Sequence, residues 1–163
     1  MRDEAGVSAE PDTGALERTL AGVLVALMGV AVVNVLWQVF SRFVLNDPSS
    51  MTEELARYLL IWISLLGGAY AVGRRLHPAI DLLAGSLAGS LRTRQWRLVH
   101  VTILMFAVGV MVVGGLRLVT LTLSLGQTSA AMGIPLGYVY LALPVSGAII
   151  SWYAALALWR GPA

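Results

Sequence analysis

The stretch Thr19–Ser41, TLAGVLVALMGVAVVNVLWQVFS, decides the fold, because it is long, apolar and free of charge. About 20 helical residues, each rising about 1.5 Å, are needed to cross the hydrocarbon core of a membrane. Three more apolar stretches follow along the chain, over about 55–73, 98–125 and 134–159. No strand-like alternation of polar and apolar residues competes with the helical pattern. The sequence therefore predicts an all-α integral membrane protein with four transmembrane helices.

The composition supports a membrane protein and excludes several other classes. Of the 163 residues, 58% are hydrophobic and 12% are charged, whereas charged residues make up about 25% of a typical soluble domain. So few charges exclude an ordinary soluble globule, a disordered chain and a nucleic-acid-binding protein. The sequence has no cysteine, which excludes disulfides and thiolate metal sites.

The distribution of arginines predicts the orientation in the membrane. The segment between the second and third stretches is rich in arginine, while the other two connections hold Arg42 and Arg57, and Arg117 alone. Because short cytoplasmic loops carry the excess of arginine, this segment and both termini are predicted to be cytoplasmic. We expect a disordered cytoplasmic tail over 1–15 and a four-helix transmembrane domain over 16–160.

The same arginine-rich segment contains a second pattern. Its apolar residues Ile80, Leu83, Leu87 and Leu91 recur at spacings of three and four. This is typical of a short amphipathic helix that lies in the membrane interface, which we place at about 79–91. The flanking arginines are candidate contacts to lipid headgroups: Arg74, Arg75, Arg92, Arg94 and Arg97.

Ionisable residues inside a membrane are the usual functional candidates, and the middle of each stretch holds no Asp, Glu, Lys or His. We therefore assign no catalytic, substrate-binding or metal-ligating residue, and no enzyme activity. Two alternatives stay open. One is an autonomous small transporter, for which only Asn34 and Gln38 offer polar groups. The other is a haem-binding subunit of an oxidoreductase, which would use His77 and His100.

Small and polar residues suggest a contact between subunits. Asn34 and Gln38 share one helix face, which Arg42 continues toward the outer surface, and Ser64 and Gly68 form a small-xxx-small pair. In lipid, polar and small residues favour a face covered by protein. Packing inside the chain's own bundle is the alternative to a contact with another membrane subunit.

The first outer loop leads into the second helix through a cluster of polar residues, Thr52, Glu53, Glu54 and Arg57. One interpretation is structural: Thr52 or a neighbouring serine caps the helix, the carboxylates face the helix dipole, and Arg57 pairs with them. The other interpretation is a periplasmic docking site for a partner.

Several motifs, taken in order, resemble one known family. They are the run from Trp37 to Asn46, WQVFSRFVLN, then TEELAR over 52–57, then the arginine and histidine of RRLH at 74–77, and QTSAAMGIP over 127–135. Over about residues 16 to 160, the chain resembles the small membrane subunit of tripartite ATP-independent periplasmic (TRAP) transporters, the DctQ-like family.

The resemblance implies a function and partners. In such transporters a periplasmic binding protein captures an organic acid, and a large membrane subunit moves it inward on an ion gradient, usually of sodium. The small subunit is expected to brace the large one and help dock the binding protein, in the bacterial inner membrane. The resemblance implies no cofactor in this chain, and sodium is expected in the partner subunit.

Overall fold

The structure, a computed structural model, describes residues 13–47, 49–74 and 90–161. Its described part contains seven helical segments: α1 (Thr13–Phe43), α2 (Ser50–Gly73), α4 (Ser90–Phe106), the π-helix η1 (Ala107–Gly114), α5 (Gly115–Ser124), α6 (Gly137–Tyr140) and α7 (Ala142–Arg160). α4, η1 and α5 follow one another without a break and form one long rod.

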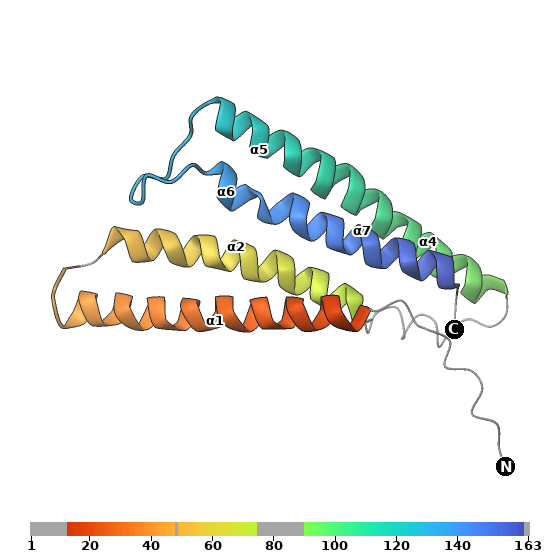
Figure 1. The fold of residues 1–163 in the computed structure, drawn as a ribbon, viewed down its shortest axis with the longest axis horizontal. Helices are drawn as coiled ribbons and strands as arrows, with labels where there is room; N and C mark the ends of the chain where they lie inside the picture. The colour runs from red at the N-terminus through yellow and green to blue at the C-terminus, as the bar shows by residue number, and fades with distance from the viewer. Residues whose placement is uncertain (1–12, 48, 75–89, 162–163) are drawn as a thin grey trace, which may run out of the picture.

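The helices pair as two hairpins that lie side by side (Figure 1). One hairpin is α1 with α2, and the other is the α4–η1–α5 rod with α6 and α7. α7 is the central helix, because it contacts α2 as well as every segment of the rod, whereas α1 contacts α2 and no other described element. Most of the α1 surface is therefore left outside the bundle.

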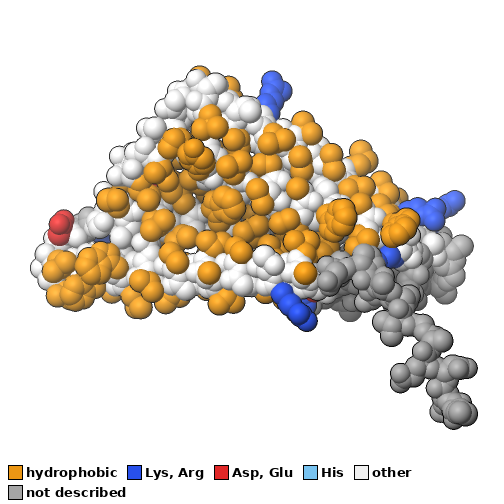
Figure 2. Space-filling view, in the orientation of Figure 1, with side chains coloured by type: hydrophobic (Ala, Val, Ile, Leu, Met, Phe, Trp, Pro, Cys, Tyr) orange, Lys and Arg blue, Asp and Glu red, His pale blue; other side chains and the backbone are white. Residues whose placement is uncertain are grey.

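The outer surface is apolar, as the sequence predicts for a membrane protein. Four described helical stretches are long and apolar enough to cross a membrane: Gly14–Phe43, Ser50–Gly73, Thr93–Ser124 and Gly137–Arg160. Hydrophobic side chains spread over the middle of the visible face, and charged ones lie toward its edges (Figure 2). Because large apolar residues such as Val25, Met105 and Trp159 are exposed, this surface suits lipid rather than water. The predicted all-α membrane fold with four spanning helices is confirmed.

The helix bounds differ from the apolar stretches at several ends. α1 already begins at Thr13, α2 begins at Ser50, and the α4–η1–α5 rod begins at Ser90 rather than near 98. α6 and α7 form one continuous spanning stretch, Gly137–Arg160, because the Leu141 amide between them still donates to the Gly137 carbonyl at 3.1 Å. The first turns of these helices are polar, so the apolar stretches in the sequence do not include them although they belong to the same helices. Most of the predicted tail and most of the interfacial helix at 79–91 lie outside the described residues, and the orientation of the termini stays a prediction.

α7 packs closely against the α4–η1–α5 rod at two glycines, Gly147 in α7 and Gly115 in α5. A Cβ atom at Gly147 would lie 2.6 Å from Cβ of Met111, and one at Gly115 would lie 2.9 Å from Cδ of Pro144. Both distances are too short for a real contact, so only glycine permits this approach. Close backbone approach at small residues is a main source of helix association in lipid.

Candidate functional site

The site with the most specific geometry is the carboxylate of Glu54, in the second turn of α2. Its Oε2 accepts hydrogen bonds from Ser129 Oγ at 2.6 Å, from the Ala131 amide at 2.8 Å and from the Met132 amide at 3.3 Å. Its Oε1 accepts one from the Tyr58 hydroxyl at 2.6 Å. Glu54 is buried, and these four donors replace the water that a buried carboxylate loses. The carboxylate thus ties the first hairpin to the loop of the second.

That loop, residues 125–136, is itself folded as a small turn structure. Gly126 and Gly133 adopt positive φ angles of 61° and 68°, a region that glycine enters at little cost. Thr128 and Pro135 form an antiparallel bridge, and the Ser129 amide donates to the Ile134 carbonyl at 2.8 Å. Ser129 Oγ also accepts from the Met132 amide at 3.1 Å. The loop therefore presents a defined shape, which Glu54 fixes to α2.

Glu54 lies near the start of α2, as the sequence predicts, but its partners are not the predicted ones. Glu54 does not pair with Arg57, because both of its oxygens are taken by hydroxyl and amide donors. Thr52 is not the N-cap: the helix begins at Ser50, and the Thr52 hydroxyl donates to the Ser49 carbonyl at 2.9 Å. The cap residue Ser49 makes no side-chain capping bond.

Asn34 lies at the seam between α1 and α2 and is 7% exposed. Its Nδ2 donates to the Thr52 carbonyl at 2.8 Å. The amide that was expected to reach another subunit thus faces Thr52 inside the chain, because a buried amide in an apolar bundle takes the nearest acceptor. Of the two open interpretations for Asn34, the structure supports packing within the bundle.

Other predicted residues share one exposed face of α2. Glu53, Arg57, Leu60, Ser64 and Gly68 are all exposed and follow one another at spacings of four, three, four and four. Outside its own helix turn, a Cβ atom at Gly68 would meet no atom of the described residues within 4 Å. We call these five residues the α2 stripe. It unites Ser64 and Gly68, predicted for a subunit contact, with two residues of the predicted docking cluster.

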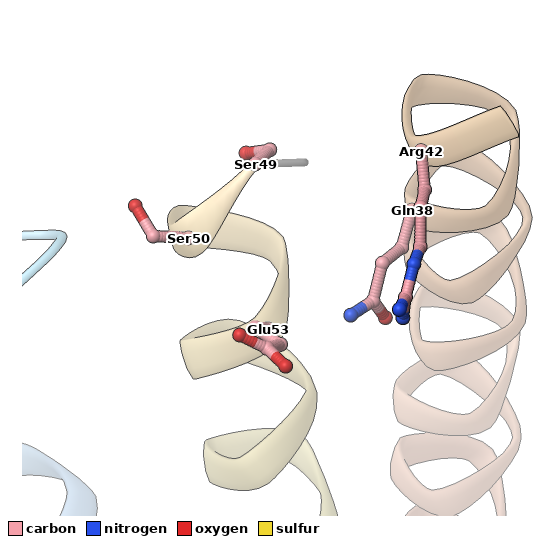
Figure 3. Close-up of a pocket in the computed structure, with 5 residues that line it drawn as sticks. All are labelled: Gln38, Arg42, Ser49, Ser50 and Glu53. Carbon is pink, nitrogen blue, oxygen red and sulfur yellow. The ribbon is translucent and has the colours of Figure 1, made fainter. Parts of the chain in front are cut away.

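Gln38 and Arg42 face a hollow of about 300 Å³ between the end of α1 and the start of α2. Ser49, Ser50 and Glu53 line it from the α2 side, and Figure 3 shows Glu53 across the hollow from the ends of the Gln38 and Arg42 side chains. Arg42 and Glu53 form no ion pair with each other. The hollow thus has a cation on one wall and an anion on the other.

The predicted headgroup arginines are described in part. Arg74 directly follows α2 and donates to the Tyr70 hydroxyl at 2.9 Å, with its Cζ 5.7 Å from the centre of the Tyr70 ring. The hydrogen bond to Tyr70 raises the pKa of Arg74 above its usual value. Arg94 and Arg97 are exposed in α4; the Arg92 side chain and all of Arg75 lie outside the described part.

Two further positions bear on the predicted alternatives. Arg117 lies within α5 rather than in a loop and is exposed, so its long side chain can reach toward the end of the helix. His100 packs its ring against Trp96, with ring centres 4.3 Å apart, and its Nδ1 lies 2.9 Å from the Trp96 carbonyl oxygen. His77 lies outside the described residues, so the haem alternative stays untested by the structure.

Comparison with known proteins gives the class of the molecule. Residues 30–162 match the model of the family described as tripartite ATP-independent periplasmic transporters, DctQ component. The match covers most of the chain. The chain therefore belongs to the DctQ family, a multi-pass inner-membrane component of a transporter and not an enzyme.

Two relatives show which component of a transporter the chain is similar to. The chain is 32% identical over 92 residues to the sialic acid TRAP transporter small permease protein SiaQ of Vibrio cholerae, covering 56% of this chain and 53% of SiaQ. It is 24% identical over 136 residues to a TRAP transporter small permease protein of Haemophilus influenzae, covering 83% of each. The chain thus spans about half the length of SiaQ and most of the second relative.

A third relative has a different layout. The chain is 36% identical over 95 residues to the isethionate TRAP transporter permease protein DctMQ of Oleidesulfovibrio alaskensis, covering 58% of this chain and 15% of that protein. The matched region is there a small part of a much longer permease polypeptide. This layout supports a large membrane subunit as the partner of the small one.

Proposed function

We propose that this chain braces the large membrane subunit of a TRAP transporter and helps to dock a soluble substrate-binding protein. The complete transporter takes up an organic acid on an ion gradient, with sodium as the expected ion. In this proposal the large subunit carries the substrate and the ion, and the small subunit supplies surface and rigidity.

The observation that carries the bracing role is the α2 stripe. Ser64 and Gly68 are exposed within a spanning helix, where lipid offers no hydrogen-bond partner and gains little from a small side chain. A second helix could approach Gly68 closely, because no described atom beyond its own turn of α2 would lie within 4 Å of its Cβ. The DctMQ relative, where the matched region belongs to a longer permease chain, supports the large subunit as that second partner.

The Glu54 site supports the docking role. It holds the 125–136 loop between two spanning stretches, beyond the ends of α5 and α6. Gln127, Thr128, Ala130 and Gly133 in this loop are exposed. A loop of fixed shape beside the membrane gives a soluble protein a surface that needs little ordering on binding.

Reconstitution in liposomes tests the proposal. Vesicles with the large subunit, with this chain, or with both would receive a binding protein, a sodium gradient and a panel of radiolabelled carboxylates. We expect uptake only with both membrane subunits and the binding protein present. Uptake by this chain alone at the rate of the full system would show an autonomous transporter and refute the proposal.

A further inference from the structure

The hollow between α1 and α2 joins the outer end of the α2 stripe. Glu53 belongs to both, because it is the first residue of the stripe and also lines the hollow. Arg42 lies across the hollow from Glu53, on α1 (Figure 3). Among the described residues, neither side chain forms an ion pair within 4.0 Å. The hollow and the stripe therefore make one continuous surface with two unpaired, opposite charges at its outer end.

Side-chain length changes steadily along the α2 stripe. From the small residues Gly68 and Ser64, the stripe passes through Leu60 to the long, charged Arg57 and Glu53 at the outer end. A helix that touched the stripe at Gly68 and crossed it at about 20° would lie roughly 8 Å further away at Glu53, which is about 22 Å along α2. Small side chains suit the narrow end of such a helix pair, and long side chains suit its wide end.

A helix that covers this surface also covers its charges. Arg42 and Glu53 are exposed in the isolated chain, so both are hydrated. Covering them removes this water, and a charge that is buried without a partner is strongly destabilising. The rest of the hollow offers only the neutral side chains of Gln38, Ser49 and Ser50. A covering helix is therefore favourable only if it brings an opposite charge to each wall.

We infer that the hollow receives an acidic and a basic side chain, one turn apart, from the large-subunit helix that packs on the α2 stripe; the inference rests on the proposed bracing role. The acidic side chain binds the guanidinium of Arg42, with Gln38 as a further donor, and the basic side chain binds Glu53. Residues at i and i+4 lie about 5–6 Å apart on one helix face, so one helix can reach both walls. These charges fix the register of the two subunits, whereas Ser64 and Gly68 set how closely the helices approach.

Recovery of the large subunit through a tag on this chain tests the inference. The informative variant exchanges the two charges, Arg42→Glu with Glu53→Arg. The exchange keeps any pairing between these two residues, but it opposes like charges on both walls if a partner supplies them. We expect recovery to fall at least about tenfold, while thermal stability of the isolated chain matches wild type. Arg117→Gln, which removes an exposed arginine of α5 outside the hollow, is the control and should leave recovery unchanged.

A rescue experiment tests the charges of the partner. Paired charge reversals at i and i+4 in the spanning helices of the large subunit are screened against the exchanged chain, and one such pair should restore recovery. If the wild-type chain does not recover the large subunit, the bracing role itself is wrong. Normal recovery by the exchanged chain, beside lost recovery in Gly68→Leu, would leave that role standing and refute the inference. If the exchange releases the binding protein but not the large subunit, the hollow meets the soluble protein, and the inference is wrong.

Discussion

At the scale of single residues, Glu54 shows how a buried carboxylate can be stable without a cation. Two backbone amides and two hydroxyls surround it, and each hydrogen bond to a charged group contributes about 1.5–3 kcal/mol. Its neighbour Glu53 is exposed and takes no part. The pair therefore offers a matched comparison within one helical turn.

We predict that Glu54→Ala frees the 125–136 loop. The Ala131 and Met132 amides lose their acceptor, so their hydrogen exchange should become roughly 10- to 100-fold faster. Hydrogen-exchange mass spectrometry of a peptide covering this loop measures the change. Glu53→Gln, one residue earlier, should leave the exchange as it is. Unchanged protection in Glu54→Ala would mean that the turn bonds alone hold the loop.

The sequence could not separate Glu54 from Glu53, since both follow Thr52 and both suit the first turns of a helix. Successive residues of a helix point about 100° apart, so Glu54 and Glu53 face different surroundings. Glu54 faces Ser129, which lies 75 residues further along the chain. Local patterns carry no information about such a contact. The small polar run over 127–135 is one of the family motifs, but only the fold shows that its Ser129 hydroxyl and two of its amides face a carboxylate.

At the scale of elements, the four spans followed from the sequence because apolar length alone determines them. The π-helix η1 within the third span did not. The step between α6 and α7 lies next to Pro144, which has no N–H to donate to the Tyr140 carbonyl, so this irregularity has a local cause in the sequence. The close contact of Gly115 with Pro144 depends on the register between two helices, which no local pattern carries.

The register of α7 against the α4–η1–α5 rod gives a testable prediction. Gly147→Ala should destabilise the chain by about 1–3 kcal/mol, because the added methyl would lie 2.6 Å from Cβ of Met111. Thermal unfolding in detergent measures the loss. Gly109→Ala in η1 adds the same methyl where no atom lies within 4 Å, and it should be neutral or stabilising by up to about 1 kcal/mol. Equal effects of the two changes would show that the close approach is not important.

At the scale of the whole molecule, the orientation is set by charge, and it can be tested directly. The chain has no native cysteine, so single cysteines at Asp47, Ala130 and Ser86 report their own positions. An impermeant thiol reagent on intact cells should label the first two, in the outer loops, and leave position 86 unlabelled until the cells are permeabilised. The reverse pattern would invert the predicted topology.

The remaining question at this scale is which outer face meets the large subunit. α1 contacts only α2 among the described elements, and α2 exposes the stripe that ends at Gly68. Both helices thus offer an exposed glycine, since among the described residues Cβ atoms at Gly22 in α1 and Gly68 in α2 would meet no atom within 4 Å outside their own helix turns. A larger side chain at either position therefore reports on external contacts.

We predict that Gly68→Leu disrupts the subunit contact and Gly22→Leu does not. The added volume should cost about 1–3 kcal/mol in a closely packed helix pair, so recovery of the large subunit through a tag on this chain should fall by roughly tenfold. Expression and thermal stability of the isolated chain should match wild type in both variants, which separates lost assembly from lost folding. If Gly22→Leu alone reduces recovery, the large subunit packs on α1, and the α2 stripe faces lipid.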